Sequence, residues 1–289
     1  MARRLGLGIV IITGLTGLFA PVRGADIHVD NANGVDSNDG LAAVAMTVIN
    51  GPVRTLKRAT QLVQAGDTIV LNGSGRPFYE PLCLVGGSHS GFLSKPFTIQ
   101  GNGAVISGLR ELPSDGWRQQ SAGVWRLSLT RKGYYRFFRG DQSIPEFLPT
   151  TADAVLDDLP LDHYLSRRGD VIFRFDERNT PFTQSWSYAA DDTGVSLVSV
   201  RNVRIVNLHV VGFRVDGINI DGNCRGVTLD NVASEHNGRA GVSANGTSQV
   251  FLENSRITGN GRHSVFVSEF ARVNVAGSDL GGVEPTVAE

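Results

Sequence analysis

The 289-residue sequence has little cysteine and little lysine, and these shortages exclude several classes of protein. Two cysteines, Cys83 and Cys224, are too few for a disulfide framework or a cysteine-based zinc site, and the sequence leaves open whether they pair. The three lysines are Lys57, Lys95 and Lys132, so arginine supplies most of the positive charge. The formal net charge of -1 argues against a nucleic-acid partner, which requires a basic surface.

Long apolar runs are confined to the N-terminus. Two arginines precede the almost uncharged stretch Leu5–Ala20, a pattern typical of a secretory signal peptide. The run is shorter than the ~20 residues of a membrane-spanning helix. Val22 and Gly24 suit cleavage before Ala25. We therefore predict a leader over residues 1–24, a secreted or periplasmic mature chain, and no membrane span after cleavage.

The C-terminal third repeats with a period of about 23 residues, which is the pattern of a repeat architecture. Valines recur at intervals of 24, 23 and 23 residues, and each has an aliphatic residue two places later. These pairs are Val203 with Ile205, Val227 with Leu229, Val250 with Leu252, and Val273 with Val275. The constant period places each strand over its own copy, so we predict parallel sheets whose neighbouring strands are about 4.8 Å apart rather than antiparallel hairpins.

Other columns follow the same period. Asn207, Asn231 and Asn254 stand four residues after the first three valines, and we expect their amides to form a ladder from coil to coil. Small residues open a second set of short strands: Ile218–Ile220 after Gly217, Val242–Ala244 after Gly241, and Val265–Val267 after Ser264. The preceding turn, Asn237-Gly238-Arg239, recurs as Asn260-Gly261-Arg262, and Asn-Gly predicts positive backbone φ there.

The upstream half contains short apolar runs that we interpret as the first coils. These runs are Asp67–Leu71, Leu82–Val85, Phe97–Gln100 and Ala104–Ser107. Helical spacing over Thr55–Gln64 predicts a short amphipathic helix that covers the open end of the stack. The stretch Leu109–Ala190 breaks the pattern, holds all three tryptophans and is interpreted as a β-rich insertion, after which the repeats resume near Val195.

The predicted fold class is therefore all-β: a right-handed, single-stranded parallel β-helix with an N-terminal capping helix and a β-rich insertion. The expected segments are the leader (1–24), the N-terminal strand, loop and cap helix (25–66), the first coils (67–108), the insertion (109–190), the repeats (191–282) and a tail (283–289).

Several motifs resemble the secreted bacterial pectate-lyase-like β-helix proteins. The motifs are Ile27–Asp30, Asp36–Gly40, Thr55–Ala59, Ala65–Leu71 and Lys95–Gly101. The resemblance covers roughly Asp26–Gly108 and Val195–Leu280. It implies the β-helix fold, but the group includes polysaccharide lyases, glycoside hydrolases, epimerases and proteins without known catalysis, so it leaves the activity open.

The repeated Asn-Gly-Arg turn carries the residues that a uronate lyase needs. Such an enzyme removes a proton next to a carboxylate, and so requires a base and a cation or Ca²⁺. His236 or His263 is the candidate base, and Arg239 with Arg262, which share one column, would hold the carboxylate. The alternative is a solvated arginine ladder with histidines that cap turns.

Hydrolysis of a glycoside would instead need two carboxylates. Asp230 and Glu253 are predicted to face outward one coil apart, at roughly the separation of a retaining enzyme. Asp216 and Glu235, on or near the turns, are further candidates. The alternative is that these are ordinary exposed acids.

Two more features suggest ligands. The aromatic residues Trp117, Trp125, Tyr134 and Tyr135 could stack on sugar rings or form the core of the insertion. The loop Asp30–Asp39 is rich in oxygen ligands, so Ca²⁺ is a candidate cofactor; a solvated turn is the alternative.

We therefore hypothesise a secreted carbohydrate-active protein that acts on or binds an acidic polysaccharide, with β-elimination slightly favoured over hydrolysis. A non-catalytic binding or structural module is the second hypothesis, because the outward column Arg204, Thr228, Phe251 and Asn274 forms no acid-base set. A third is that the chain is a fragment of a longer β-helix. The sequence does not indicate an oligomeric state.

Overall fold

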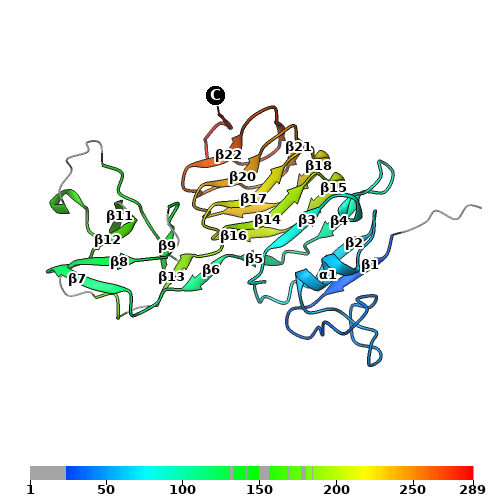
Figure 1. The fold of residues 1–289 in the computed structure, drawn as a ribbon, viewed down its shortest axis with the longest axis horizontal. Coiled ribbons are helices and arrows are strands. Elements are labelled where there is room, and N and C mark those ends of the chain that lie inside the picture. Colours follow the sequence, from blue (N-terminus) through cyan, green and yellow to red (C-terminus); the bar gives the residue numbers. More distant parts are fainter. Residues whose placement is uncertain are drawn as a thin grey trace, which may run out of the picture.

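A computed structural model describes residues 24–130, 133–140, 142–149, 156–167, 169–176, 180–183 and 185–288. Three parallel sheets wind around one apolar core, and an antiparallel unit projects from one corner of this stack (Figure 1). The predicted leader lies outside the described residues except for Gly24, so export stays a prediction. Within the described ranges, no helix is long and apolar enough to cross a membrane.

Sheet A has seven strands and contains the valine column. In spatial order they are β1 (Asp26–Val29), β2 (Thr68–Leu71), β4 (Phe97–Gln100), β15 (Arg201–Val206), β18 (Arg225–Asp230), β21 (Gln249–Glu253) and β23 (Arg272–Ala276). Val203 pairs with Val227, Val227 with Val250, and Val250 with Val273, all in parallel register. The repeat spacing therefore identified the register between coils correctly.

Two further sheets complete each coil. Sheet B contains β5 (Val105–Ser107), β16 (His209–Val211) and β19 (Ala233–Glu235). Sheet C contains β3 (Leu82–Val85), β14 (Thr193–Val198), β17 (Asp216–Asp221), β20 (Ala240–Ala244), β22 (His263–Val267) and β24 (Thr286–Val287). Along the chain a coil passes through sheets A, B and C in turn, and its inward aliphatic side chains are buried in the common core.

The predicted capping helix is present as α1 (Leu56–Leu62). It begins after Thr55, whose side chain accepts a hydrogen bond from the Arg58 amide, and Leu56 and Ala59 are buried. The helix contacts β1 and β3, so it covers the first coils.

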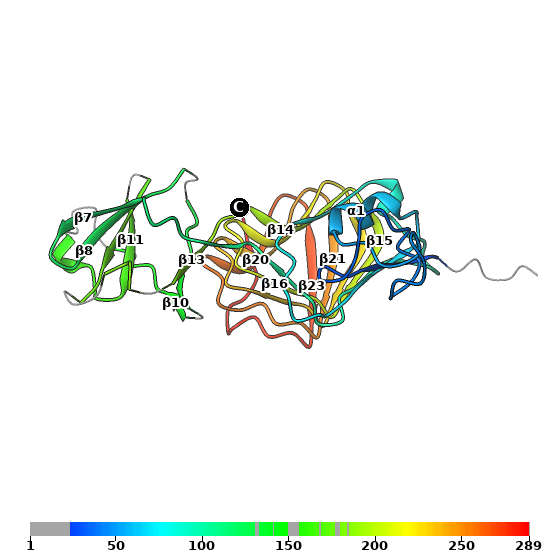
Figure 2. The ribbon, with the colours of Figure 1, turned by 90° about the horizontal axis from the view of Figure 1, so that it is seen from below.

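The insertion leaves the stack after β5 and returns before β14, at the corner between sheets B and C. One of its antiparallel sheets contains β10 (Gln142–Ile144), β9 (Phe137–Arg139), β13 (Trp186–Ala189) and β6 (Leu109–Glu111). The other contains β11 (His163–Arg167), β12 (Asp170–Arg174), β8 (Val124–Ser128) and β7 (Trp117–Ser121). Leu82 of β3 pairs directly with Val195 of β14, so the stack continues across the interruption. Figure 2 shows the insertion extending sideways from the coils.

The asparagine column behaves differently from our expectation. Asn207, Asn231 and Asn254 all have positive φ, from 48° to 52°, at the turn between sheets A and B. The Asn231 amide reaches Asn207 Oδ1 at 3.4 Å, but Asn254 donates to Asp230 Oδ1 at 3.0 Å. The column is thus explained by the tolerance of asparagine for left-handed backbone and not by a continuous amide ladder.

A shorter stack, of the buried Asn237 and the half-buried Asn260, occurs at the turn between sheets B and C. Asn260 Oδ1 accepts hydrogen bonds from the Asn237 backbone amide at 2.9 Å and from Asn237 Nδ2 at 3.0 Å. Asn237 Oδ1 in turn accepts from the Phe213 amide at 2.9 Å. These side chains satisfy backbone donors of the neighbouring coil in the core, as buried polar groups require.

The prediction of positive φ at the glycine of the Asn-Gly-Arg turn was wrong. The left-handed residues are His236 (φ 56°) and Gly259 (φ 66°), which precede the motif. Gly238 is required for another reason: a Cβ atom there would collide with the carbonyl oxygens of Tyr134 and Arg214. The glycine lets the insertion and the neighbouring coil approach the turn closely.

We expect Gly238→Ala to lower the free energy of unfolding by about 2 kcal/mol, because rigid backbone atoms occupy the space that the methyl group needs. Gly87→Ala is the matched control, since no atom lies within contact of a Cβ atom at Gly87. Urea denaturation followed by circular dichroism measures both. Equal midpoints for the two variants would contradict the packing explanation.

Candidate functional site

The turns between sheets B and C are where the insertion contacts the β-helix. Arg262 forms an ion pair with Glu146 of the insertion at 3.0 Å, and Arg136 Nη2 donates to the Gly259 carbonyl at 2.7 Å. Tyr134 comes from the same part of the insertion, and its carbonyl lies against Gly238. We call the group Tyr134, Asp216, Arg239, Arg262 and His263 the corner site.

A buried ion pair lies at its base. Arg239 on the turn donates from Nε and Nη2 to the two carboxylate oxygens of Asp216, at 2.9 and 2.5 Å. The Asp216 side chain is only 2% exposed. Burial raises the pKa of Asp216, and the hydrogen bonds from Arg239 oppose that rise. The Arg239 guanidinium also lies 5.4 Å from the centre of the Phe266 ring.

The second arginine of the column is also paired. Burial raises the pKa of Glu146, and the charges of Arg262 and Arg136 oppose this shift. Arg239 and Arg262 lie in adjacent coils, as predicted, since the Arg262 amide donates to the Arg239 carbonyl. Each guanidinium nevertheless already has a carboxylate partner within the protein, so neither is the free cation that the sequence suggested.

His263 is the first residue of β22 and has one ring nitrogen engaged. Its Nδ1 lies 3.0 Å from Thr286 Oγ1, and Nε2 has no hydrogen-bond partner among the described residues. Burial lowers the pKa of His263, and the positive charge of Arg239 lowers it further, with Arg262 adding to the effect. The imidazole is therefore neutral at pH 7 and able to accept a proton at Nε2 if Nδ1 donates to Thr286.

His236 is on the other side of the turn, after β19 of sheet B. Its ring meets Phe138 of the insertion edge-on at 6.0 Å, and its Nδ1 is buried without a hydrogen-bond partner in the described chain. Burial lowers the pKa of His236, and the charge of Arg136 lowers it further. The two histidines flank the equivalent turns of adjacent coils, and His236 packs against Phe138 of the insertion.

The predicted carboxylates do not converge. Asp230 and Glu253 are in register on neighbouring strands, but hydrogen bonds from Asn254 and Arg204 lower the pKa of Asp230. Glu235 lies on sheet B, where burial raises its pKa but hydrogen bonds from its neighbours Arg256 and Thr258 outweigh this and lower it. A general acid needs a raised pKa, and burial raises the pKa of Asp216.

Three of the four predicted sugar-stacking residues are covered by protein. Trp117, Trp125 and Tyr135 are buried in the insertion, where Trp117 packs 5.0 Å from Phe173. Tyr134 is 42% exposed and lies beside Arg239. Only Tyr134 of this set therefore offers a ring face to solvent, and it does so in the corner site.

The proposed calcium loop uses its carboxylates to hold backbone. Asp30 accepts from the amides of Ala32 and Asn33, and Asp36 accepts from the amide of Thr55. In the part of the chain that the structure describes, no three His, Cys, Asp or Glu residues gather around a potential metal. The loop carboxylates of Asp30 and Asp36 thus hold backbone amides of the protein in place.

The cysteines left open above are both free thiols; Cys83 is exposed and Cys224 is buried. Cys83 points outward from β3, whereas the Cys224 thiol contacts the carbonyls of Leu197 and Asp221.

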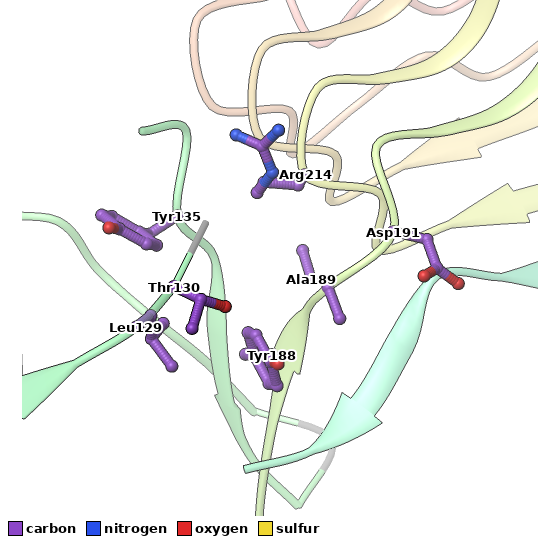
Figure 3. A pocket seen from close by; sticks show the side chains of 8 residues that line it. Leu129, Thr130, Tyr135, Tyr188, Ala189, Asp191 and Arg214 are labelled. Carbon is purple, nitrogen blue, oxygen red and sulfur yellow. The ribbon is translucent and has the colours of Figure 1, made fainter. Parts of the chain in front are cut away.

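A small pocket lies at the root of the insertion, next to the corner site. It encloses about 190 Å³ and is lined by Leu129, Thr130, Tyr135, Tyr188, Ala189, Ala190, Asp191 and Arg214. Figure 3 shows Arg214 on one side and Tyr188 on the other. Arg214 belongs to the coil below Arg239 and pairs with Asp192 at 2.8 Å. The volume suits a single sugar ring and is below that of a drug-sized site.

Sequence reasoning missed two residues of this region. Glu146 has no repeat or motif to mark it, because the insertion lacks internal periodicity. Phe266 could have been found, since it falls in the outward column of sheet C with Asn219 and Ser243.

Comparison with known proteins defines the class of fold. Residues 178–283 match the family model of the right-handed β-helix region. A solved structure described as the complex of XylC with xylose aligns over 88% of this chain and 58% of its own, at 12% identity and a TM-score of 0.55. This chain thus spans less than two thirds of that structure.

Two weaker structural similarities have TM-scores below 0.5. The first is a glycoside hydrolase, at 12% identity and a TM-score of 0.47, with 86% of this chain and 68% of that chain covered. The second is pectate lyase Pel9A, at 14% identity and a TM-score of 0.36, with 87% of this chain and 62% of that chain covered. No curated protein matches the sequence. The chain is a right-handed parallel β-helix protein, as the sequence predicted.

Proposed function

We propose that this protein acts on an acidic polysaccharide at the corner site by β-elimination. The observation that carries the proposal is His263, whose imidazole is held neutral beside the guanidinium groups of Arg239 and Arg262. A uronate lyase needs this combination of a neutral base and neighbouring cations. The exposed ring of Tyr134 supplies a surface for a sugar at the same place.

In the proposed reaction, His263 Nε2 takes the proton from the carbon next to the uronate carboxylate. The electron pair of that C–H bond forms the new double bond as the glycosidic C–O bond breaks, and the leaving oxygen takes a proton from water. Negative charge grows on the substrate carboxylate, where the two guanidinium groups stabilise it. Asp216 holds Arg239 in position from below.

We expect His263→Ala to reduce formation of unsaturated product by about 10²- to 10⁴-fold, the usual contribution of a general base. The activity of the unsubstituted protein should fall as pH drops through the lowered pKa of His263, because only the neutral imidazole accepts the proton. Product absorbance from a panel of polyuronates measures both. His163→Ala, in β11 of the insertion, is the control, and undiminished turnover by His263→Ala would overturn the assignment.

A non-catalytic polysaccharide-binding module is the second candidate. It is favoured by the internal pairing of both arginines, which leaves no unpaired cation at the corner site to hold a carboxylate. Binding of polyuronate by the unsubstituted protein without release of unsaturated product would establish this alternative. Hydrolysis has less support because the pKa of Asp230 is lowered, opposite to the need of a general acid.

We also propose that the protein works outside the cytoplasm, on the evidence of the predicted leader. N-terminal sequencing of exported protein that begins at Ala25 would support this, and an intact Met1 would contradict it.

A further inference from the structure

A loop between β1 and α1 exposes several large aliphatic side chains close together. The loop spans residues 41–50, and no charged residue occurs from Gly40 to Val53. Five of its side chains are between 56% and 92% exposed: Leu41, Val44, Met46, Val48 and Ile49. We call residues 41–50 the apolar loop. Contiguous exposed apolar surface of this kind marks a site of interaction.

The apolar loop projects from the first coil. Figure 1 shows the dark-blue chain of this region beyond β1 and α1, on the side away from the later coils. A cavity of about 370 Å³ lies under the loop, lined by Ala43 and Val44 on one side and by Val70 and Asn72 of the first coils on the other. The five large side chains are therefore not part of the β-helix core.

The base of the loop is fixed by Asp39. Its carboxylate accepts hydrogen bonds from the Leu41 amide at 3.0 Å and from Asn50 Nδ2 at 3.1 Å. The Asp39 amide donates to the Ile49 carbonyl at 2.9 Å. The two arms of the loop are thus joined at the base, which presents the aliphatic side chains outward on a defined backbone.

The tip of the loop satisfies much of its own backbone. The amides of Met46 and Thr47 donate to the Asn50 carbonyl at 2.8 and 3.3 Å. Thr47 Oγ1 accepts from the amides of Ile49 and Asn50 at 3.4 and 3.0 Å. A segment that enters an apolar phase needs such internal hydrogen bonds, because lipid offers none.

The chemistry of the loop favours lipid over a protein partner. Protein interfaces are enriched in aromatic residues and arginine at their centre, and they carry a hydrogen bond for every ~100–200 Å². The apolar loop has no aromatic ring and no charge, and its one hydroxyl, on Thr47, is already used within the loop. A projecting tip also buries little of its surface against a flat protein, whereas a fluid layer closes around it.

The charges around the base indicate which lipid surface fits. The charged residues nearest in sequence are Asp36 and Asp39 before the loop and Arg54 and Lys57 after it. Two negative and two positive charges give little attraction to an anionic surface. Binding therefore depends on the buried apolar area and not on the charge of the headgroups.

We infer that the apolar loop inserts into the surface of a lipid layer with electrically neutral headgroups. The side chains of Val44, Met46 and Val48 enter the boundary between headgroups and acyl chains, and the base at Asp39 stays in water. The inference goes beyond the proposed function and does not depend on it. The loop belongs to the capped end of the stack, whereas the corner site is on the turns of later coils.

The test measures binding to phosphatidylcholine vesicles by co-sedimentation. The variant is Val44→Ser/Met46→Ser/Val48→Ser, in the full chain prepared in the same way as the unsubstituted protein, so that any leader contributes equally. Because apolar area provides the binding, we expect the variant to partition at least about tenfold less onto the vesicles. Added salt should leave binding of the unsubstituted protein unchanged.

The matched control is Leu93→Ser/Leu148→Ser/Leu161→Ser, which removes three exposed aliphatic side chains outside the loop. The control should change binding less than about twofold. Equal losses in the two triple variants would overturn the inference, because general surface apolarity would then explain the binding. Absence of binding by the unsubstituted protein would also overturn it, as would binding that high salt abolishes.

A second readout uses single substitutions and does not require a stable triple variant. Val48→Trp places an indole at the tip, and Leu93→Trp places one at a similarly exposed position outside the loop. The three native tryptophans are buried in the insertion, so their emission is a constant background. On addition of vesicles, the emission of Val48→Trp should shift to shorter wavelength and that of Leu93→Trp should not. Equal shifts, or no shift for either, would contradict insertion.

Two more measurements separate this inference from its alternatives. Light scattering without lipid that shows a dimer of the unsubstituted protein and a monomer of the triple loop variant would assign the loop to a second copy and overturn the lipid assignment. If no preparation releases unsaturated product but the loop variant still loses vesicle binding, β-elimination fails and the inference stands. If product forms and the loop variant binds vesicles normally, insertion fails alone.

Discussion

Replacing Phe173 by alanine is expected to lower the stability of the insertion strongly while the stability of the β-helix is largely unchanged. Phe173 is fully buried. The centre of its ring lies 4.9 Å from the ring centre of Phe137, 5.6 Å from that of Trp186 and 5.0 Å from that of Trp117. Truncating a buried phenylalanine costs about 3–5 kcal/mol, which is a large part of the stability of a small unit. These aromatic side chains form a cluster distinct from the core of the coils.

Tryptophan fluorescence measures this outcome selectively. All three tryptophans, Trp117, Trp125 and Trp186, are in the insertion, so their emission does not report on the β-helix. In Phe173→Ala, we expect the unfolding transition seen by tryptophan fluorescence to move to lower denaturant concentration. The protection of the β17 and β20 amides against hydrogen exchange should be largely unchanged. Phe270→Ala, on an 82% exposed side chain of the stack, is the control. A single coincident transition for both probes would show instead that the insertion and coils unfold together.

The register of the coils was predictable because one local rule repeats. Val203, Val227 and Val250 face the same core, so their spacing alone defines the coil and the partner of every strand. The conformation of the turns was harder to predict. The sequence Asn237-Gly238 suggested positive φ, but the glycine is needed because the carbonyl oxygens of Tyr134 and Arg214 lie close to it. That approach depends on a segment that is remote in sequence.

The placement of two residues of the corner site was predictable for the same reason. The repeat period placed Arg239 over Arg262, and the structure shows these residues in adjacent coils. Their partners, Asp216 and Glu146, could not be assigned, because a period says which residues share a column and not which way a long side chain turns. The insertion, which supplies Glu146 and covers His236, has no repeat from which its position could be inferred.

Breaking the buried ion pair between Arg239 and Asp216 is expected to cause a second large loss of stability. In Arg239→Ala the carboxylate of Asp216 stays buried without its partner, and such broken pairs cost about 3–5 kcal/mol. Asp216→Asn/Arg239→Gln should lose much less, because it removes both charges and retains groups that can hydrogen-bond. Urea denaturation at neutral pH measures the free energy of unfolding of both variants.

The pH dependence of the loss separates the effect of charge from that of packing. The pKa of Asp216 is already raised by burial in the folded protein, and without Arg239 it rises further. A folded-state pKa above the unfolded one means that stability is lost as pH rises, so the deficit of Arg239→Ala should be largest near neutrality. The deficit should shrink below about pH 4, where the carboxyl is protonated in both states. A deficit that is constant with pH would mean that the aliphatic part of Arg239 and its contact with Phe266 stabilise the corner, and that the ion pair does not.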